Sequence, residues 1–214
     1  MIISRVMTRD PITINPDMSV NEIRDLMDKE QIGHLPVMDK KNNLVGLVTR
    51  ADLSKSGPSA ATSLDMYEIS YLLSKMTAKD VMEKNVITVD ENEVVEEAAR
   101  IMTDKGIGCL PVMRWKFLVG IITDTDLFNV FVNAFGSRYK GIRITFSIKE
   151  KPGQMVKISQ AIAEQNGNIL SFITSEGDDP SCRRLTTKIE GISREQLETI
   201  MKSFPDVELE DIRE

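Results

Sequence analysis

Residues 32–38 read IGHLPVM and residues 46–52 read GLVTRAD, and the same pattern returns as IGCLPVM at residues 107–113 and GIITDTD at residues 120–126. When residues 6–53 are aligned with residues 81–127 and one residue is deleted, about nineteen of the aligned pairs are identical. Two copies are too few for a solenoid. They predict two small units that pair face to face about a pseudo-twofold axis. The pairing buries apolar surface that neither unit can bury alone.

Within each copy, the residue pattern predicts the order strand, helix, strand, strand, helix. In the first copy Ser19 and Glu22 form a capping box, and Ile23, Leu26 and Met27 then recur at helical spacing. The expected strands are residues 12–14, 35–38, 44–49, 86–89, 110–113 and 118–123, and the final helices begin at Asp52 and Asp126.

A third unit follows the repeat. Pro152-Gly153 is expected to open a helix that Gly167 ends, and Ser193 with Gln196 caps a second helix. The expected strands are residues 142–148, 169–174, 185–189 and 207–212. The order βαββαβ is the ferredoxin-like arrangement.

The chain as a whole is therefore predicted to be an α/β (α+β) protein. The repeat units are expected at residues 1–56 and 77–135, with a linker helix at residues 57–76 between them. The third unit is expected at residues 140–214.

The composition excludes several classes of protein. Lys and Arg total 27 while Asp and Glu total 33, a formal net charge of −6 that argues against duplex-DNA binding. One histidine, His34, and two cysteines, Cys109 and Cys182, are too few for a His/Cys zinc site, an iron–sulfur cluster or a disulfide scaffold. No apolar run approaches the roughly 18 residues of a membrane span, and residues 1–10 lack a signal-peptide core. The prediction is a cytoplasmic protein with no nucleic-acid or membrane partner and no metal.

The most informative pattern is Gly, two aliphatic residues, Thr, two variable residues and Asp at a strand-to-helix junction. In one interpretation, Thr49 and Asp52 only cap the helix. In the other, the helix N-terminus and the Thr49 hydroxyl bind a phosphate, Asp52 accepts from both ribose hydroxyls, and Gly46 lets the backbone approach the ligand closely. One Thr and one Asp can serve both roles, so both interpretations stay open.

The duplicated blocks resemble a tandem CBS-domain pair, or Bateman module, over about residues 1–135. The resemblance implies a clefted disc that binds an adenosine nucleotide such as AMP, ADP or ATP, or else S-adenosylmethionine. It implies that ribose and phosphate are held by Thr49, Asp52, Thr123 and Asp126. It also implies adenine slots walled by the segments around Thr13 and Thr88 and by Gly33, His34, Leu35, Gly108, Cys109 and Leu110.

The two sites are not expected to be equivalent. The first offers His34 and Arg50, with Lys40 and Lys41 nearby, whereas the second has Cys109 and Asp124 at the matching positions. Extra negative charge repels a polyphosphate. We therefore expect the Asp52 site to prefer phosphorylated adenosine and the Asp126 site to take a less anionic ligand. His34 can equally be a packed histidine.

The third unit resembles an ACT domain over about residues 140–214. The similar residues are Lys151-Pro152-Gly153 before the first helix and Gly167-Asn168-Ile169 after it, although Glu150 stands where that family has Asp. The resemblance implies side-by-side dimerisation and an amino acid bound near Gly153, Gln154, Gly167 and Asn168. The alternative is that Pro-Gly only starts a helix and Gly167 only caps it.

Together these patterns predict a regulatory homodimer without catalysis, which senses an adenosine ligand and acts on an unidentified target. A CBS pair with an ACT-like tail is also similar to bacterial regulators linked to acetoin utilization. The alternatives are a ligand-free assembly module, a sensor of S-adenosylmethionine or NAD, and an enzyme. Arg114-Trp115-Lys116 is interpreted as a solvated turn, and Phe128, Phe131 and Phe135 as a buried seam or a dimer contact.

Overall fold

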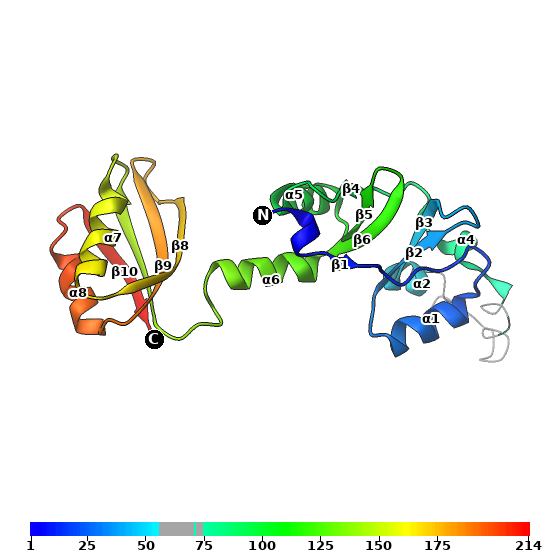
Figure 1. The fold of residues 1–214 in the computed structure, drawn as a ribbon, viewed down its shortest axis with the longest axis horizontal. Coiled ribbons are helices and arrows are strands. Elements are labelled where there is room, and N and C mark those ends of the chain that lie inside the picture. The colour runs from blue at the N-terminus through cyan, green and yellow to red at the C-terminus, as the bar shows by residue number, and fades with distance from the viewer. Residues whose placement is uncertain (56–70, 72–74) are drawn as a thin grey trace. The chain divides into compact units, whose positions relative to one another are not determined.

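The computed structural model describes residues 1–55, 71 and 75–214 (Figure 1). The chain divides into two compact units, Met1–Leu127 and Phe128–Glu214. Most of the linker helix expected at residues 57–76 lies outside the described residues. Among the helices of those three described stretches, none has the length and apolarity to cross a membrane.

The first unit contains both repeats, with the predicted mixture of helices and strands. Its elements are η1 Ile3–Arg5, β1 Thr8–Arg9, α1 Val20–Lys29, β2 His34–Met38, β3 Leu44–Thr49, α2 Arg50–Lys55, α4 Ala78–Val81, β4 Val89–Asp90, α5 Val95–Lys105, β5 Cys109–Arg114 and β6 Phe117–Thr123. Helix α6, Asp124–Ala134, begins in the first unit and continues past its boundary at Leu127. The expected strand at residues 12–14 is only an isolated parallel bridge from Ile14 to Val37. The helices α2 and α6 begin two residues earlier than expected, because Asp52 and Asp126 are the third residues of their first turns.

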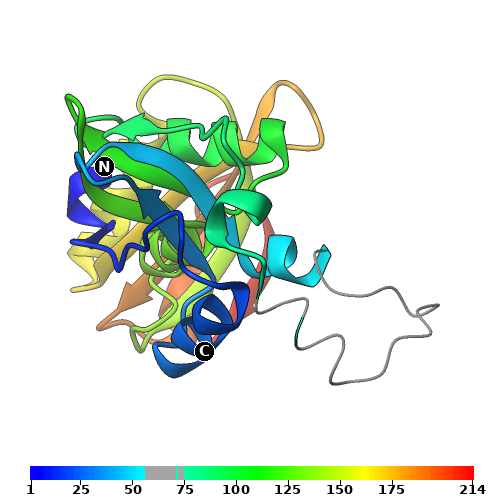
Figure 2. The same ribbon diagram turned by 90° about the vertical axis from the view of Figure 1, so that its right-hand side faces the viewer.

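The helix α1 forms where the capping box predicts it. The Ser19 side chain accepts from Glu22 N at 3.3 Å, and Ser19 N donates to Glu22 Oε2 at 2.9 Å. Its apolar stripe, which includes the fully buried Ile23 and Met27, packs in one core cluster with Leu35 of β2. The β2–β3 pair and α1, drawn in blue, face the viewer in Figure 2.

Each repeat is completed by the segment that precedes the other one. The N-terminal arm joins the second repeat: Ile3 N donates to Glu93 O at 2.8 Å, and β1 pairs with β6 in the sheet β1-β6-β5-β4. The segment before the second repeat joins the first in the same way, since Ala78 N donates to Met18 O at 2.8 Å and Glu83 bridges Leu47. The two repeats therefore exchange their leading segments reciprocally.

Two glycines make this exchange possible. A Cβ on Gly46 would overlap the side chain of Met82, and a Cβ on Gly120 would overlap the Met7 sulfur and lie 2.9 Å from Thr8 O. Gly46 was expected to let a ligand approach the backbone. That expectation is wrong, because the space beside Gly46 is filled by Met82 from the exchanged segment.

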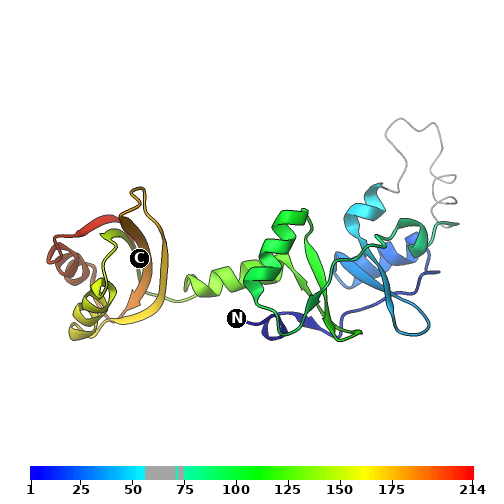
Figure 3. The same cartoon turned by 90° about the horizontal axis from the view of Figure 1, so that it is seen from above.

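The second unit confirms the expected order βαββαβ. Its elements are β7 Ile142–Lys149, α7 Gln154–Glu164, β8 Asn168–Glu176, β9 Cys182–Glu190, α8 Arg194–Lys202 and β10 Val207–Arg213. The strands form one antiparallel sheet in the order β10-β7-β9-β8. Both helices cover the same face of this sheet (Figure 3), where Ile158 and Leu197 pack around Phe146.

Helix α7 starts as predicted but ends differently. Gly153 is its N-cap, with a φ of 83° in the left-handed region that glycine tolerates. At the other end, the left-handed residue is Asn166, with a φ of 59°, and not Gly167. Gly167 is required for another reason, since a Cβ there would lie 2.7 Å from Ile162 Cγ2.

The phenylalanines of α6 and of the segment after it stand at the start of the second unit, just past the boundary at Leu127. Phe128 is 68% exposed and Phe131 is 57% exposed, although the Phe131 and Phe135 rings lie 4.4 Å apart between centroids. Both interpretations, the buried seam and the dimer contact, stay predictions.

We expect Gly120→Ala to destabilise the first unit by about 1–3 kcal/mol, because the added methyl group meets both a side chain and the backbone of the exchanged arm. Gly46→Ala is expected to cost less, since it meets only the flexible Met82. Denaturant unfolding followed by circular dichroism measures both changes. Gly33→Ala is the control, because its Cβ would meet nothing closer than 3.9 Å. An unchanged midpoint for Gly120→Ala would contradict this account of the exchange.

Candidate functional site

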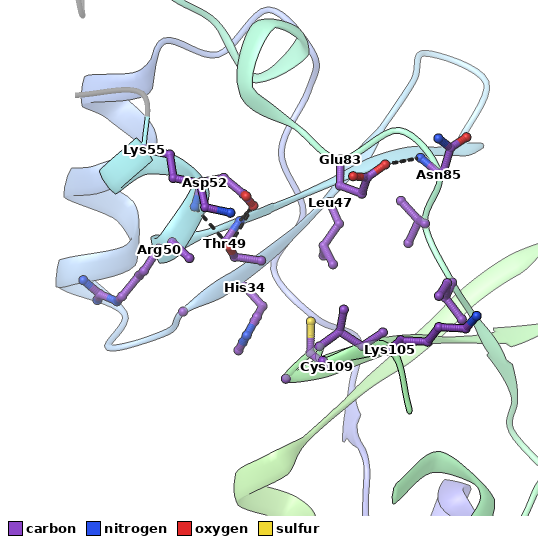
Figure 4. A pocket seen from close by; sticks show the side chains of 17 residues that line it. His34, Leu47, Thr49, Arg50, Asp52, Lys55, Glu83, Asn85, Lys105 and Cys109 are labelled. Carbon is purple, nitrogen blue, oxygen red and sulfur yellow. Dashed lines mark hydrogen bonds between the residues drawn. The ribbon is translucent and has the colours of Figure 1, made fainter. Parts of the chain in front are cut away.

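A cavity of about 580 Å³ opens between the repeats of the first unit (Figure 4). Its first-repeat wall includes Gly33, His34, Leu47, Thr49, Arg50, Asp52 and Lys55. Its second-repeat wall includes Glu83, Asn85, Val86, Ile87, Lys105, Ile107, Gly108 and Cys109. Seven of the residues singled out in the sequence thus meet at one cavity: Gly33, His34, Thr49, Arg50, Asp52, Gly108 and Cys109.

Thr49 and Asp52 are held at the junction of β3 and α2. Asp52 Oδ2 accepts from Thr49 N at 3.0 Å and from Thr49 Oγ1 at 2.7 Å, and Asp52 N donates to Thr49 Oγ1 at 3.3 Å. The capping interpretation of this pair is therefore correct. Because both residues also line the cavity, the cap fixes an anionic carboxylate and a hydroxyl in its wall.

Arg50 lines the cavity, but its guanidinium is engaged by another helix. Its guanidinium donates to Met27 O at 2.9 Å and to Asp28 Oδ1 at 2.7 Å, at the C-terminal end of α1. Figure 4 shows its side chain directed away from the space between His34 and Cys109. The expected cations Lys40 and Lys41 lie in the β2–β3 turn and do not line the cavity.

Lys55 and Lys105 line the cavity instead, and sequence reasoning did not single them out. The segment around Thr88 was expected in the wall, and its residues Val86 and Ile87 do line the cavity, although Thr88 itself does not. Their presence follows from the exchange, which carries the start of the second repeat along the β3 edge of the first through the Leu47–Glu83 bridge. Hydrophobic side chains and both lysines therefore come to one cavity from segments far apart in the sequence.

The two most reactive side chain types in the wall are both held uncharged. Burial lowers the pKa of His34 below its usual range, against the opposing effect of the Asp124 and Asp52 carboxylates. Burial also raises the pKa of the Cys109 thiol to about 12, and the same two carboxylates add to that rise. At neutral pH the wall therefore presents a neutral imidazole and a protonated thiol.

The second motif has the same local geometry as the first. Asp126 Oδ2 accepts from Thr123 N and from Thr123 Oγ1, each at 2.8 Å. Neither residue lines the cavity beside Asp52, and neither does Asp124, although Asp124 Oδ2 would lie 3.4 Å from a Cβ on Gly108.

The remaining expected adenine-wall residues are placed elsewhere. Leu35 and Leu110 are fully buried in the strands β2 and β5. Thr13 and Thr88 are exposed and lie outside the lining of this cavity. In the part of the chain that the structure describes, no three His, Cys, Asp or Glu side chains are grouped to hold a metal ion.

The four expected amino-acid-binding residues of the second unit are not brought together. Gly153 and Gln154 line a cavity of about 550 Å³ at the start of α7, together with Lys149, Lys151 and Arg183 among others. Asn168 lies at the other end of α7 beyond Gly167, where its Nδ2 donates to Glu190 Oε1 at 2.8 Å.

Comparison with known proteins places the first unit in a family. A family model described as the CBS domain matches residues 3–58 and 78–133. L-aspartate semialdehyde sulfurtransferase of Methanocaldococcus jannaschii is 29% identical over 131 residues, which are 61% of this chain but only 23% of that protein. The match therefore spans about a quarter of the length of this curated relative.

Solved structures match the same part of the chain. A putative acetoin utilization protein (AcuB) from Vibrio cholerae is 30% identical, with a TM-score of 0.53 over 65% of this chain and 98% of that one. The CBS domain pair of protein MJ0100, in complex with 5-methylthioadenosine and S-adenosyl-L-methionine, is 28% identical, with a TM-score of 0.52 over 65% of this chain and 98% of that one. CBSX2 in complex with AMP is 26% identical, with a TM-score of 0.50 over 61% of this chain and 96% of that one.

The environment of His34 predicts a simple titration. Because the chain has one histidine, a single imidazole signal in the NMR spectrum reports His34. Its midpoint is expected below about 6.5, and Asp124→Asn is expected to lower it further by removing a carboxylate that favours the charged ring.

The same shift predicts a pH dependence of stability. The unfolded chain binds a proton at His34 below about pH 6.5, where the folded chain still resists protonation, so stability falls as the pH drops through that window. His34→Gln is the control, since it is expected to flatten this part of the profile. A His34 midpoint at or above about 6.5 would contradict the account.

Proposed function

The chain belongs to the CBS-domain family, and from this premise we propose that it is a regulatory protein that binds an adenosine-containing ligand in the cavity beside Thr49 and Asp52. The observation that carries the proposal is the composition of that cavity, in which a fixed Thr–Asp pair faces apolar side chains of the other repeat (Figure 4). Its volume of about 580 Å³ falls in the range of small-molecule sites. The similar CBS domain pair of MJ0100 is in complex with 5-methylthioadenosine and S-adenosyl-L-methionine, and the similar protein CBSX2 is in complex with AMP.

The cavity offers a group for each part of such a ligand. In our proposal, adenine packs against Val86, Ile87 and Ile107, the aliphatic side chains that the second repeat contributes to the cavity wall. The ribose hydroxyls donate to Asp52, because a carboxylate can accept further hydrogen bonds beside those from Thr49. Lys55 and Lys105 take the place that was expected of Arg50, and pair with the phosphate or carboxylate end of the ligand.

The motif at Thr123 and Asp126 is proposed to be a second, weaker site, or one for a less anionic ligand. It has the same cap, but Asp124 stands where Arg50 stands in the first repeat. Thr13, Leu35, Thr88 and Leu110 were expected to wall the adenine slots. In this proposal they flank the two sites and do not contact the ligand. S-adenosylmethionine is a second candidate ligand, favoured by its presence in the related CBS pair of MJ0100.

We further propose that the second unit acts as an ACT-like domain that supports homodimerisation and binds an amino acid. Its βαββαβ order and the cavity lined by Gly153 and Gln154 support this role. The link to acetoin utilization rests on the similarity to the Vibrio cholerae protein. The proposal includes no catalysis.

A thermal-shift series tests the central proposal. AMP, ATP and S-adenosylmethionine are each added to the full chain, with guanosine monophosphate as the matched non-adenine control. A ligand at about 100 times its Kd adds about 2.7 kcal/mol of stability. We expect at least one adenosine compound to raise the melting temperature and guanosine monophosphate to raise it less.

Two matched variants locate the site. Asp52→Asn is expected to weaken ligand binding tenfold or more, because a charged hydrogen bond contributes about 1.5–3 kcal/mol. Asp126→Asn removes the equivalent charge from an identical cap, so it controls for the structural cost. It is expected to leave the strongest binding unchanged. No shift with any adenosine compound, or equal losses from both variants, would contradict the proposed site.

A further inference from the structure

The hairpin of β5 and β6 in the second repeat ends in an exposed aromatic tip made by residues 114–117 (green in Figure 1). Trp115 is 93% exposed and Phe117 is 57% exposed. With Arg114 and Lys116 they line an open concavity of about 580 Å³. The adenosine site does not involve these residues, so its function does not explain them.

The backbone conformation at Trp115 does not favour a large side chain, so the tryptophan does not stabilise the turn. Trp115 has a φ of 61°, in the left-handed region that disfavours large side chains. The other non-glycine residues with positive φ in the described residues are all polar: Asp10, Gln31, Asn42 and Asn166. A side chain in this conformation costs of order 1–2 kcal/mol, so the indole is retained against a backbone cost.

The first repeat supplies a natural comparison. Its β2–β3 turn also contains a residue with a positive φ, Asn42 at 58°. Asp39 closes that turn by accepting from Lys41 N and Asn43 N, both at 2.8 Å. The two turns differ in length, since five residues separate Met38 from Leu44 and four separate Met113 from Leu118, and of these two turns the second exposes two aromatic rings.

The aromatic tip is also braced. Arg114 donates through Nε and Nη2 to both carboxylate oxygens of Glu91, which is only 9% exposed. Pro16 occupies the position of Glu91 in the first repeat, so this brace exists only in the second. Lys116 Nζ lies 5.7 Å from the centroid of the Phe117 ring. The pairing with Glu91 thus fixes Arg114 at the base of the tip before any partner arrives, which lowers the entropic cost of binding.

We propose that this tip docks a short acidic segment of a partner protein that also carries an apolar side chain. Tryptophan is enriched among the residues that dominate protein interfaces. The apolar side chain would pack against Trp115 and Phe117, and the acidic groups would pair with Lys116. Because Arg114 is already paired with Glu91, Lys116 is the cation of the tip that sets this charge preference.

The size and charge of the surface favour a peptide over other occupants. A stable globular interface buries roughly 800 Å² on each partner, far more than a tip of four residues presents. This argues against a second copy of the chain docking here alone. An anionic bilayer would meet an extended face of a protein with a net charge of −6, whereas a peptide meets only the tip.

The single tryptophan of the chain makes the proposal measurable in the intact protein. Short synthetic peptides in which Phe and Leu alternate with Glu are titrated while the emission of Trp115 is recorded. We expect a saturable blue shift, and none with the same peptides carrying Lys in place of Glu. No shift with any acidic peptide, or an equal shift with the basic ones, would overturn the proposal. A blue shift only with vesicles of phosphatidylglycerol and phosphatidylcholine would overturn it in favour of a membrane.

Three variants make the test specific. Lys116→Glu is expected to weaken the acidic peptide about tenfold, while Lys40→Glu, the same charge change at the other tip, leaves it unchanged. Trp115→Asn puts at this positive-φ position a residue that tolerates it better, so it is expected to fold at least as stably yet lose binding of a dye-labelled acidic peptide. Retained binding in Trp115→Asn, or equal effects of the two lysine variants, would overturn the proposal. Adenosine binding is expected to be unaffected by all three, so the two proposals fail separately.

Discussion

The structure of the first unit depends on the reciprocal exchange of leading segments between its two repeats. The arm that contains Ile3 and β1 completes the second repeat, and the segment that contains Ala78 and Glu83 completes the first. Each exchanged backbone hydrogen bond contributes only about 0.5–1.5 kcal/mol net, but a repeat without its partner's segment would leave those groups and the Met7 or Met82 side chain without their packing. Neither repeat is therefore a self-contained unit.

The candidate site is a consequence of this exchange. The Thr49–Asp52 cap belongs wholly to the first repeat, yet Val86, Ile87 and Cys109 in the facing wall belong to the second. A ligand in this cavity would contact both repeats at once, so its binding would stabilise their mutual arrangement. Binding of ribose by a helix-capping carboxylate needs neither a metal nor a generally basic surface, so the acidic composition and the single histidine are compatible with the proposed sensing of an adenosine ligand.

Local structure was predictable from the sequence because it is set by neighbouring residues. The capping boxes at Ser19 and Ser193, the strand at residues 44–49 and the βαββαβ order all agree with the structure. The errors concern contacts between distant residues. The sequence around Gly46 does not reveal that Met82 packs against it. Likewise, the sequence around Arg50 does not reveal that its guanidinium donates to Met27 O at the end of α1. The lysines of the cavity were missed for the same reason, since Lys105 reaches it only through the pairing of the repeats.

The central claim is that one adenosine ligand is held by both repeats together. A crystal structure of the chain with AMP tests it most directly. The account predicts the ribose on Asp52 of the first repeat and the adenine against Val86 and Ile87 of the second. Nucleotide bound to the residues of a single repeat, or bound away from the Thr49–Asp52 cap, would contradict it.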